Sequence, residues 1–253
     1  MWGNQGGWRT VNGWARPAAA GGVGLGLRTN LSAFFELSAD GSDSTSNITN
    51  LTNNGGATFV SDTIGGVGVN VADLSSAGTQ YFSHANSSLL AVNGSDLSVS
   101  YWVKFPGGPP GSWLGQVTTS YPQQGWFMDK YFSTANFFRG SVINNNGDAA
   151  VAGDSTAAIS SSTWYLVVFT FNATTLISSI SVNGGALQSG GAMGAGLPSG
   201  ETGTFYIGND PSGSFPVEAR FARVGKWTGR LLNSTDIAAL WNGGAGLNYA
   251  GML

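Results

Sequence analysis

From residue 30 onward, apolar and polar residues alternate with the period of two that is typical of half-buried β-strands. The segment 96–105 shows this pattern most clearly. One face of this segment would carry Leu97, Val99, Tyr101, Val103 and Phe105, and the other Ser98, Ser100, Trp102 and Lys104. The segment 163–171 is apolar on both faces, which indicates a central strand.

Further short strands are predicted along the chain, separated by Gly- and Pro-rich loops. They lie at residues 31–37, 67–71, 79–83, 125–132, 136–143, 176–185, 204–209 and 217–227. The pair Asn183-Gly184 tolerates positive φ and suits a tight hairpin turn. Because these strands do not alternate with helices, the pattern predicts an all-β fold in which two antiparallel sheets form a sandwich.

One segment near the end of the chain, NSTDIAALWNGG at residues 233–244, has the signals of a helix. Asn233 is a good N-cap, and Asp236 can reach back to its backbone in the manner of a capping box. Leu232 and Ile237 can form a hydrophobic staple at the start of the helix. Ile237, Leu240 and Trp241 form one apolar face, and Gly243 can take the left-handed C′ position at the end of the helix. A helix of two turns is not stable alone, so we expect it to dock on the sandwich.

Composition excludes several classes of function. Charged residues make up only 9 % of the 253 residues, the net charge is −3, and basic residues do not cluster, so nucleic acid is not an expected partner. The chain has no Cys, so disulfides and thiolate chemistry are excluded. No apolar run approaches the ~18 residues of a membrane span, and the N-terminal sequence does not resemble a secretory signal peptide.

The first 28 residues differ from the rest. Trp2, Trp8 and Trp14 lie among Gly, Asn and Arg without strand or helix periodicity. We interpret residues 1–28 as an arm or anchor and residues 29–253 as one sandwich domain. The alternative is a loose terminus, although aromatic residues at this density usually pack on something.

Four segments resemble the laminin-G-like domains of the concanavalin A-like lectin/glucanase jelly rolls. They are residues 30–56, 78–105, 163–184 and 220–244, in the order of the family. In the last of them, the family's helix signature is matched by Leu232, Asp236, Ile237, Leu240 and Trp241, with Asn233 where Ser is common. The resemblance implies a jelly-roll sandwich closed by a short C-terminal helix, and it does not reach the arm.

Many members of this superfamily are glycosidases, which need two nearby carboxylates. This chain has only three Glu, namely Glu36, Glu201 and Glu218, and none lies in a Glu-x-Asp-x-Glu arrangement. Its one His, His84, lies in a segment typical of a loop edge. We therefore expect no catalytic residues and no enzyme activity.

The resemblance implies calcium as the usual cofactor, bound by loop oxygens. Asp40 and Asp43 lie in an acidic loop after Glu36, without the order of an EF-hand. We expect no cofactor and no metal, with calcium near Asp40 and Asp43 as the alternative to a solvated turn.

A ligand surface is predicted in the long loop region 106–130, where Trp113, Tyr121 and Trp126 could stack on sugars. Asn209 and Asp210 in a second loop could add polar contacts. The alternative is that Trp126 and Phe127 begin a core strand, because aromatic residues serve cores more often than sites.

An extracellular type of fold without a signal peptide leads to the first functional hypothesis, a non-catalytic virion protein. It would be a capsid decoration protein, head fibre or tail-associated adhesion domain, joined to other virion proteins by the arm and binding cell-surface glycans weakly. The alternative is a bacterial secreted or cell-surface lectin-like carbohydrate-binding module, and the third is a glycan-cleaving enzyme. We also expect a homo-oligomer, in which strands at 79–83 or 136–143 could pair between chains.

Overall fold

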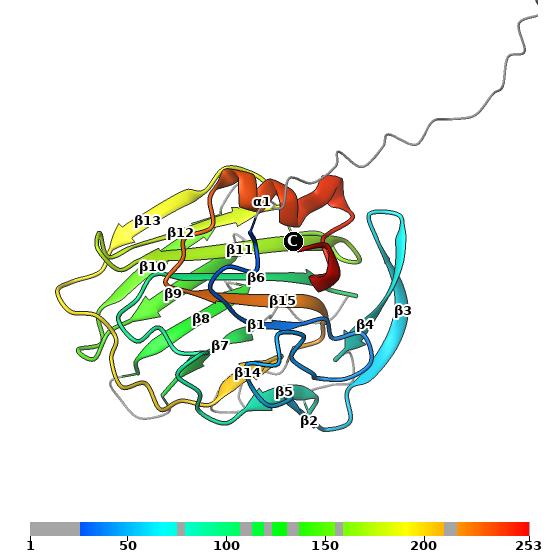
Figure 1. The fold of residues 1–253 in the computed structure, drawn as a ribbon, viewed down its shortest axis with the longest axis horizontal. Helices are drawn as coiled ribbons and strands as arrows, with labels where there is room; N and C mark the ends of the chain where they lie inside the picture. The colour runs from blue at the N-terminus through cyan, green and yellow to red at the C-terminus, as the bar shows by residue number, and fades with distance from the viewer. Residues whose placement is uncertain are drawn as a thin grey trace, which may run out of the picture.

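The computed structural model describes residues 26–74, 79–106, 113–118, 123–130, 137–154, 159–209 and 217–252. Within these ranges the chain forms two antiparallel sheets that pack face to face, with one short α-helix near the end (Figure 1). The predicted all-β sandwich with a single C-terminal helix is confirmed.

The first sheet contains eight strands, of which seven lie side by side. Their order is β13 (Gln188–Ala192), β12 (Ile177–Val182), β11 (Trp164–Asn172), β6 (Leu97–Lys104), β15 (Arg220–Thr228), β4 (Val67–Asp73) and β3 (Thr58–Ile64), and β1 (Leu31–Phe35) also pairs with β15. The second sheet has seven strands. Their order is β10 (Ala149–Asp154), β9 (Phe138–Ile143), β8 (Gly125–Lys130), β7 (Trp113–Val117), β14 (Phe205–Ile207), β5 (Tyr81–His84) and β2 (Thr52–Asn54).

The main core lies between the two sheets. On β6 the predicted inner face is confirmed, because Leu97, Val99, Tyr101 and Val103 are fully buried in this core. Trp126 on β8 lies in the same core with its ring fully buried, and its Nε1 donates a hydrogen bond to the carbonyl of Leu90 at 2.7 Å. Trp126 is therefore part of a core strand, as the alternative interpretation of this residue expected.

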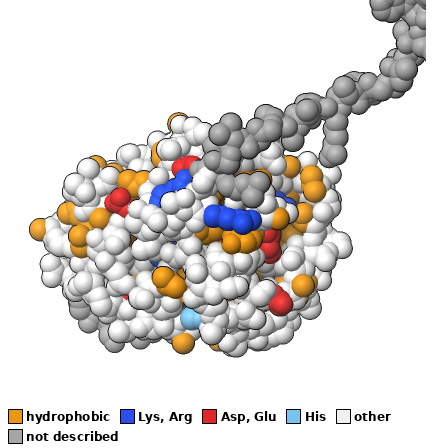
Figure 2. Space-filling view, viewed as in Figure 1, with side chains coloured by type: hydrophobic (Ala, Val, Ile, Leu, Met, Phe, Trp, Pro, Cys, Tyr) orange, Lys and Arg blue, Asp and Glu red, His pale blue; other side chains and the backbone are white. Residues whose placement is uncertain are grey.

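A second apolar layer covers the outer face of the eight-stranded sheet. The helix α1 (Ser234–Trp241) docks there, and its Ile237 and Leu240 join an apolar cluster with Trp102, which lies on the outer face of β6. The rings of Trp102 and Trp241 stack with centroids 5.4 Å apart and planes 9° apart. Figure 2 shows this side of the molecule, on which charged side chains are few.

The predicted helix signals are all present. Asn233 Oδ1 accepts hydrogen bonds from the backbone of Thr235 and Asp236, and Asp236 returns a bond by accepting from the N–H of Asn233. At the other end, Asn242 takes the left-handed C-cap conformation with φ 47°, and Gly243 follows with φ 62°. None of the helices in the described ranges is long and apolar enough to cross a membrane.

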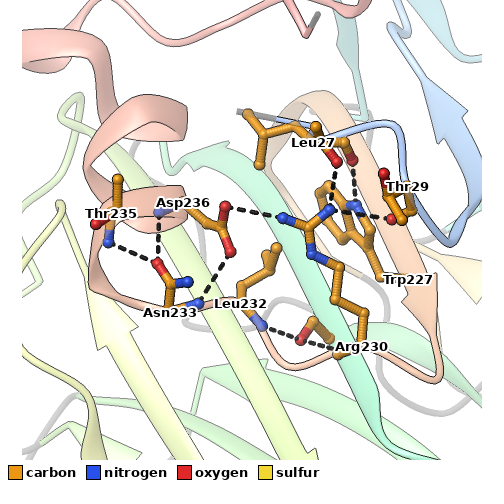
Figure 3. A network of polar contacts seen from close by, with 10 residues as sticks. Leu27, Thr29, Trp227, Arg230, Leu232, Asn233, Thr235 and Asp236 are labelled. Carbon is orange, nitrogen blue, oxygen red and sulfur yellow. Dashed lines mark hydrogen bonds and ion pairs between the residues drawn. The ribbon is translucent and has the colours of Figure 1, made fainter. Parts of the chain in front are cut away.

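The chain enters the domain beside this helix (Figure 3). Leu27 is buried in the second layer, and its carbonyl accepts a hydrogen bond from Trp227 Nε1 at 2.6 Å. The guanidinium of Arg230 donates to the carbonyl of Thr29 at 3.1 Å and to the carboxylate of Asp236 at 2.9 Å, so it ties the entering segment to the start of α1. Trp2, Trp8 and Trp14 lie outside the described residues, and the division at residue 28 stays a prediction.

The structure corrects two expectations about strands. The segments 79–83 and 136–143 were expected to be available for pairing between chains, but β5 lies between β14 and β2, and β9 lies between β8 and β10. Their backbone groups are already used within the sheet. Sequence analysis also missed β2, β3, β7, β10 and β13. Several of these are short or rich in Gly, Ala and Asn, so they lack a clear apolar alternation.

The hairpin turn predicted after β12 is present. Asn183 and Gly184 both have positive φ, at 53° and 74°, and the N–H of Gly185 donates to the carbonyl of Val182 at 3.0 Å. This is the backbone conformation that an Asn-Gly pair adopts at low cost.

Candidate functional site

The outer face of the seven-stranded sheet carries half-buried aromatic and polar side chains. Phe205, Ile207, Trp126 and Met128 point into the core. Because side chains alternate along a strand, Tyr206 and Phe127 point outward, and both are partly exposed. By the same alternation Tyr81 and Ser83 flank the buried Phe82 on the outer side of β5. We call this surface the outer face.

Tyr206, Gly115 and Phe127 form a row across three neighbouring strands. Gly115 on β7 pairs with Tyr206 on β14 and with Phe127 on β8. Neighbouring strands are about 4.8 Å apart, so the backbones of Tyr206 and Phe127 are about 10 Å apart. Gly115 has no side chain to fill the space between the two rings, and a Cβ there would lie 2.7 Å from Cα and Cβ of Phe127. Between the two aromatic residues, the row therefore has only the backbone of Gly115.

The aromatic surface continues onto β5. The rings of Tyr81 and Tyr206 have centroids 5.8 Å apart and planes at 47°. Beyond them, Asn54 on β2 donates from Nδ2 to Ser83 Oγ at 2.9 Å. Polar groups thus lie at one end of the aromatic row.

A carboxylate and a guanidinium lie beside the row, two residues along β8 and β9 from the pair of Phe127 and Ser141. Asp129 and Arg139 stand directly opposite each other on β8 and β9, next to Phe127. Arg139 Nε donates to Asp129 Oδ1 at 2.9 Å, Nη2 donates to Oδ2, and the guanidinium carbon lies 5.3 Å from the centre of the Phe127 ring. Burial raises the pKa of Asp129 by more than Arg139 lowers it. The pair combines opposite charges at the edge of an aromatic surface.

The residues predicted for a ligand site are placed differently. Trp126 is enclosed in the core, so its ring offers no face to a ligand. Asn209 is buried just after β14. Trp113 begins β7, where its backbone pairs with Asp129, but its side chain is outside the described residues, as are Tyr121 and Asp210. The region 106–130 is therefore not one long loop, because β7 and β8 occupy much of it.

Sequence reasoning missed Tyr206, Phe127, Tyr81 and the pair of Asp129 and Arg139. The signal was present, because residues 125–132 and 204–209 were predicted as strands. Once Trp126 is assigned to the core, strict alternation places Phe127 and Asp129 together on the opposite face.

The acidic loop after β1 is organised by Asp43. Its carboxylate accepts hydrogen bonds from the backbone N–H groups of Phe34, Thr45, Asn47 and Ile48 and from the hydroxyl of Thr45. Asp40 is exposed and accepts from Ser42. Within the described ranges, His, Asp and Glu side chains do not gather in threes as a metal centre would need. Calcium binding by this loop stays a prediction.

The three glutamates lie on separate parts of the fold. Glu36 follows β1 and accepts a hydrogen bond from the N–H of Tyr249 at 2.6 Å, and Glu218 lies two residues before the start of β15. Glu201 is buried, and burial raises its pKa although its carboxylate accepts from the N–H of Asn93 at 3.0 Å.

Lys226 is a fully buried cation within the sandwich. Its Nζ donates to the carbonyls of Leu89 and Ala91 at 2.7 and 2.9 Å and to Thr228 Oγ1 at 2.6 Å. Burial lowers its pKa to about 7, although the carboxylate of Glu201 acts in the opposite direction. The segment 89–93, which connects the two sheets, is therefore held by both residues. Lys226 binds the carbonyls of Leu89 and Ala91, and Glu201 binds the N–H of Asn93.

Two of the solved structures similar to this chain are binding domains of toxins. The binding domain of Paraclostridial Mosquitocidal Protein 1 aligns with a TM-score of 0.66 and 18 % identity, over 86 % of this chain and 53 % of that one. The binding domain of botulinum neurotoxin serotype G aligns with a TM-score of 0.60 and 14 % identity, over 84 % and 50 %. This chain thus spans about half the length of the toxin binding domains that it matches.

A third similar structure is covered almost completely. Domain 4 of AbnA, a GH43 extracellular arabinanase from Geobacillus stearothermophilus in complex with arabinotriose, aligns with a TM-score of 0.55 and 18 % identity, over 82 % of this chain and 96 % of that one. A comparison with curated protein sequences found no match. Residues 76–238 match the sequence pattern of the concanavalin A-like lectin/glucanases superfamily, and the chain belongs to this family.

Proposed function

We propose that this protein is a carbohydrate-binding module that holds a glycan against the outer face. The observation that carries the proposal is the row of Tyr206, Gly115 and Phe127, with the pair of Asp129 and Arg139 beside it. Binding sites for small molecules combine apolar and aromatic walls with a few polar groups that fix orientation, and this face has both parts.

The two rings and the polar groups have separate roles. The faces of Tyr206 and Phe127 cover the C–H surface of a sugar ring, which removes apolar area from water. Arg139 lies beside the row and Ser83 at one end of it, where sugar hydroxyls can exchange hydrogen bonds with them, while Asp129 holds the guanidinium in place. Because the sheet sets these positions, the site is formed before the ligand arrives, which lowers the entropic cost of binding.

Two further points support a binding role. The glutamates lie on separate elements, and Glu201 is enclosed in the protein, so we propose that the module is not catalytic. The similarity to an extracellular arabinanase domain in complex with arabinotriose, and to the binding domains of two toxins, also favours binding. We infer that the protein acts outside the cell or at the cell surface. The virion role was predicted from an extracellular type of fold without a signal peptide, and it stays a prediction.

The proposal is tested by replacing each ring. Isothermal titration with arabinotriose and other neutral oligosaccharides should give binding by the unaltered protein and at least a tenfold loss for Tyr206→Ala and for Phe127→Ala. Tyr249→Ala is the matched control, because Tyr249 is also partly exposed with an arginine, Arg28, 4.2 Å from its ring centre, but it lies on the opposite side of the sandwich. Equal losses in all three variants, or no oligosaccharide binding by the unaltered protein, would contradict the proposal.

A further inference from the structure

Lys130 lies at the end of the sandwich where strands of both sheets stop. β8 ends at Lys130 and β6 at Lys104, whereas β9 begins at Phe138 and β11 at Trp164. We propose that Lys130 forms an anion-binding site at this end, which holds one carboxylate group of a ligand. The site is on the inner side of β8 and not on the outer face, so the inference goes beyond the proposed function.

Aromatic side chains from both sheets lie beside Lys130. Phe138 stands directly opposite Lys130 on β9 and is buried in the main core, so the side chain of Lys130 shares the inner side of the sheet. Its Nζ lies 4.9 Å from the centre of the ring of Phe105, the residue after β6. The ring of Phe138 lies 6.2 Å from that of Phe105 and 5.5 Å from that of Tyr165 on β11. The ammonium is therefore placed against a wall of aromatic rings.

The charge of Lys130 has no partner in the described part of the protein. Lys104 pairs with Asp62, and Lys226 donates to backbone carbonyls. Among the described residues, by contrast, none offers Lys130 Nζ a hydrogen-bond acceptor or a carboxylate at ion-pair distance, and burial alone lowers its pKa below the usual 10.5. Holding a cation in an apolar environment without a partner costs free energy, and a bound anion would remove that cost.

Two acidic residues lie near Lys130 in the same sheet. Asp129 precedes it on β8, so alternation places the Asp129 carboxylate on the outer side, where it accepts from Arg139. Asp154 stands opposite Phe138 on β10, and its side chain lies outside the described residues. The charge balance of Lys130 is therefore the quantity to measure.

The ammonium can be reached by the charged end of a ligand. Lys130 is 6 % exposed. Its Nζ is not one of the fully enclosed polar atoms without a partner in the described chain, so the exposed part includes Nζ. An opening this small admits one ionic group and keeps the body of the ligand outside the sandwich.

The chemistry of this position suits a carboxylate. One carboxylate carries one negative charge, which one ammonium balances, and its oxygens accept the hydrogen bonds that Lys130 can donate. A phosphate group carries more charge and has three acceptor oxygens, which need further donors. The rings of Phe105 and Phe138 have none. The carboxylate can belong to an acidic sugar or to a simple carboxylic acid, and the two sources are compared in the test.

The test follows the pKa of Lys130 by nuclear magnetic resonance of isotope-labelled lysine. The lysines of the chain are Lys104, Lys130 and Lys226, so each gives one signal, and Lys104→Met and Lys226→Met assign that of Lys130 by elimination. Without ligand its pKa should lie below 10.5. Galacturonate at constant ionic strength should raise this pKa by at least about 1, because a nearby opposite charge favours the charged form. The pKa values of Lys104 and Lys226 should not change.

Titration calorimetry with galacturonate tests the same site through binding. Lys130→Met keeps the apolar stem and removes the charge, and it should lower the affinity for galacturonate at least tenfold. Lys104→Met is the matched control, because it removes the same charge from a lysine that already pairs with Asp62, and it should bind galacturonate as the unaltered protein does. Acetate that raises the pKa of Lys130 as much as galacturonate shows that the carboxylate alone is recognised, whereas a larger effect of galacturonate shows that the sugar contributes.

Three results overturn the inference. A pKa of Lys130 at or above 10.5 without ligand means that a carboxylate of the protein already balances the charge. A pKa that neither galacturonate nor acetate changes means that the site holds no anion. A larger rise with inorganic phosphate than with either carboxylate means that the ligand class is wrong. Binding of arabinotriose is measured separately, and its absence would contradict the proposed function without affecting the site at Lys130.

Discussion

Lys226 allows a quantitative test of the interior of the sandwich. Burial lowers its pKa to about 7 from the usual 10.5, against the effect of the Glu201 carboxylate. Between these two pH values the unfolded chain binds a proton that the folded protein does not bind. The free energy of unfolding therefore rises with pH in this interval, and Lys226→Met should abolish the rise.

The size of the effect follows from the same difference in proton binding. Each pH unit well inside the interval adds about 1.4 kcal/mol to the free energy of unfolding, and about half as much near pH 7, where the folded protein still binds half a proton. The rise between pH 7 and pH 9 is therefore about 2 kcal/mol. Glu201 also changes the free energy of unfolding with pH, but it does so at lower pH and with the opposite sign. Burial raises its pKa, so its ionisation costs stability as the pH rises above its usual value of 4.5. The comparison is therefore made above pH 7.

The assay is urea unfolding followed by tryptophan fluorescence from pH 7 to pH 9 at constant ionic strength. Lys104→Met is the matched control, because Lys104 is a lysine on the neighbouring strand whose Nζ pairs with Asp62 at 2.8 Å rather than lying fully buried. This control should keep the rise of the unaltered protein. The reasoning is refuted if the unaltered protein shows no rise over this range, or if Lys226→Met rises in parallel with it.

Two further predictions concern the outer side of the eight-stranded sheet. Asn233→Ala removes the acceptor for the N–H groups of Thr235 and Asp236 and should lower the free energy of unfolding by about 1 kcal/mol in urea titrations. The variant should leave oligosaccharide affinity unchanged. An unchanged free energy of unfolding would mean that the N-cap is dispensable. Burial alone would raise the pKa of Asp62, but hydrogen bonds from Lys104 and Arg220 outweigh it and lower the pKa to about 2. Stability from Asp62 should therefore be lost as the pH falls from 4 toward 2, and Asp62→Asn should flatten the acid side of the stability profile; identical profiles would exclude this role.

Local signals explain which parts of the fold could be predicted from sequence. The helix was assigned correctly because Asn233 and Asp236 act within one turn of each other. The alternation along β6 was sufficient to separate its core face from the face that carries Trp102. By contrast, β2 and β13 are strands because neighbouring strands pair with them, and their own residues carry little strand preference.

The candidate site depended on information that the local sequence lacks. Tyr206, Gly115 and Phe127 are adjacent only because β14, β7 and β8 pair in one particular register. Choosing ligand residues from the region 106–130, taken as a long loop, included Trp126, whereas burial assigns Trp126 to the core and its neighbour Phe127 to the surface. The pairing of Asp129 with Arg139 likewise requires the register of β8 with β9.

The hydrogen bonds of Arg230 and Trp227 to residues 26–29 make the two sides of the sandwich different. They hold Leu27 and Thr29 in the layer that covers the eight-stranded sheet, whereas the aromatic row lies on the far side of the other sheet. Gly26, where the described part of the chain begins, therefore lies on the side of the sandwich opposite the aromatic row. Under the proposed function, a glycan on the outer face and the segment around Gly26 occupy opposite sides of the domain.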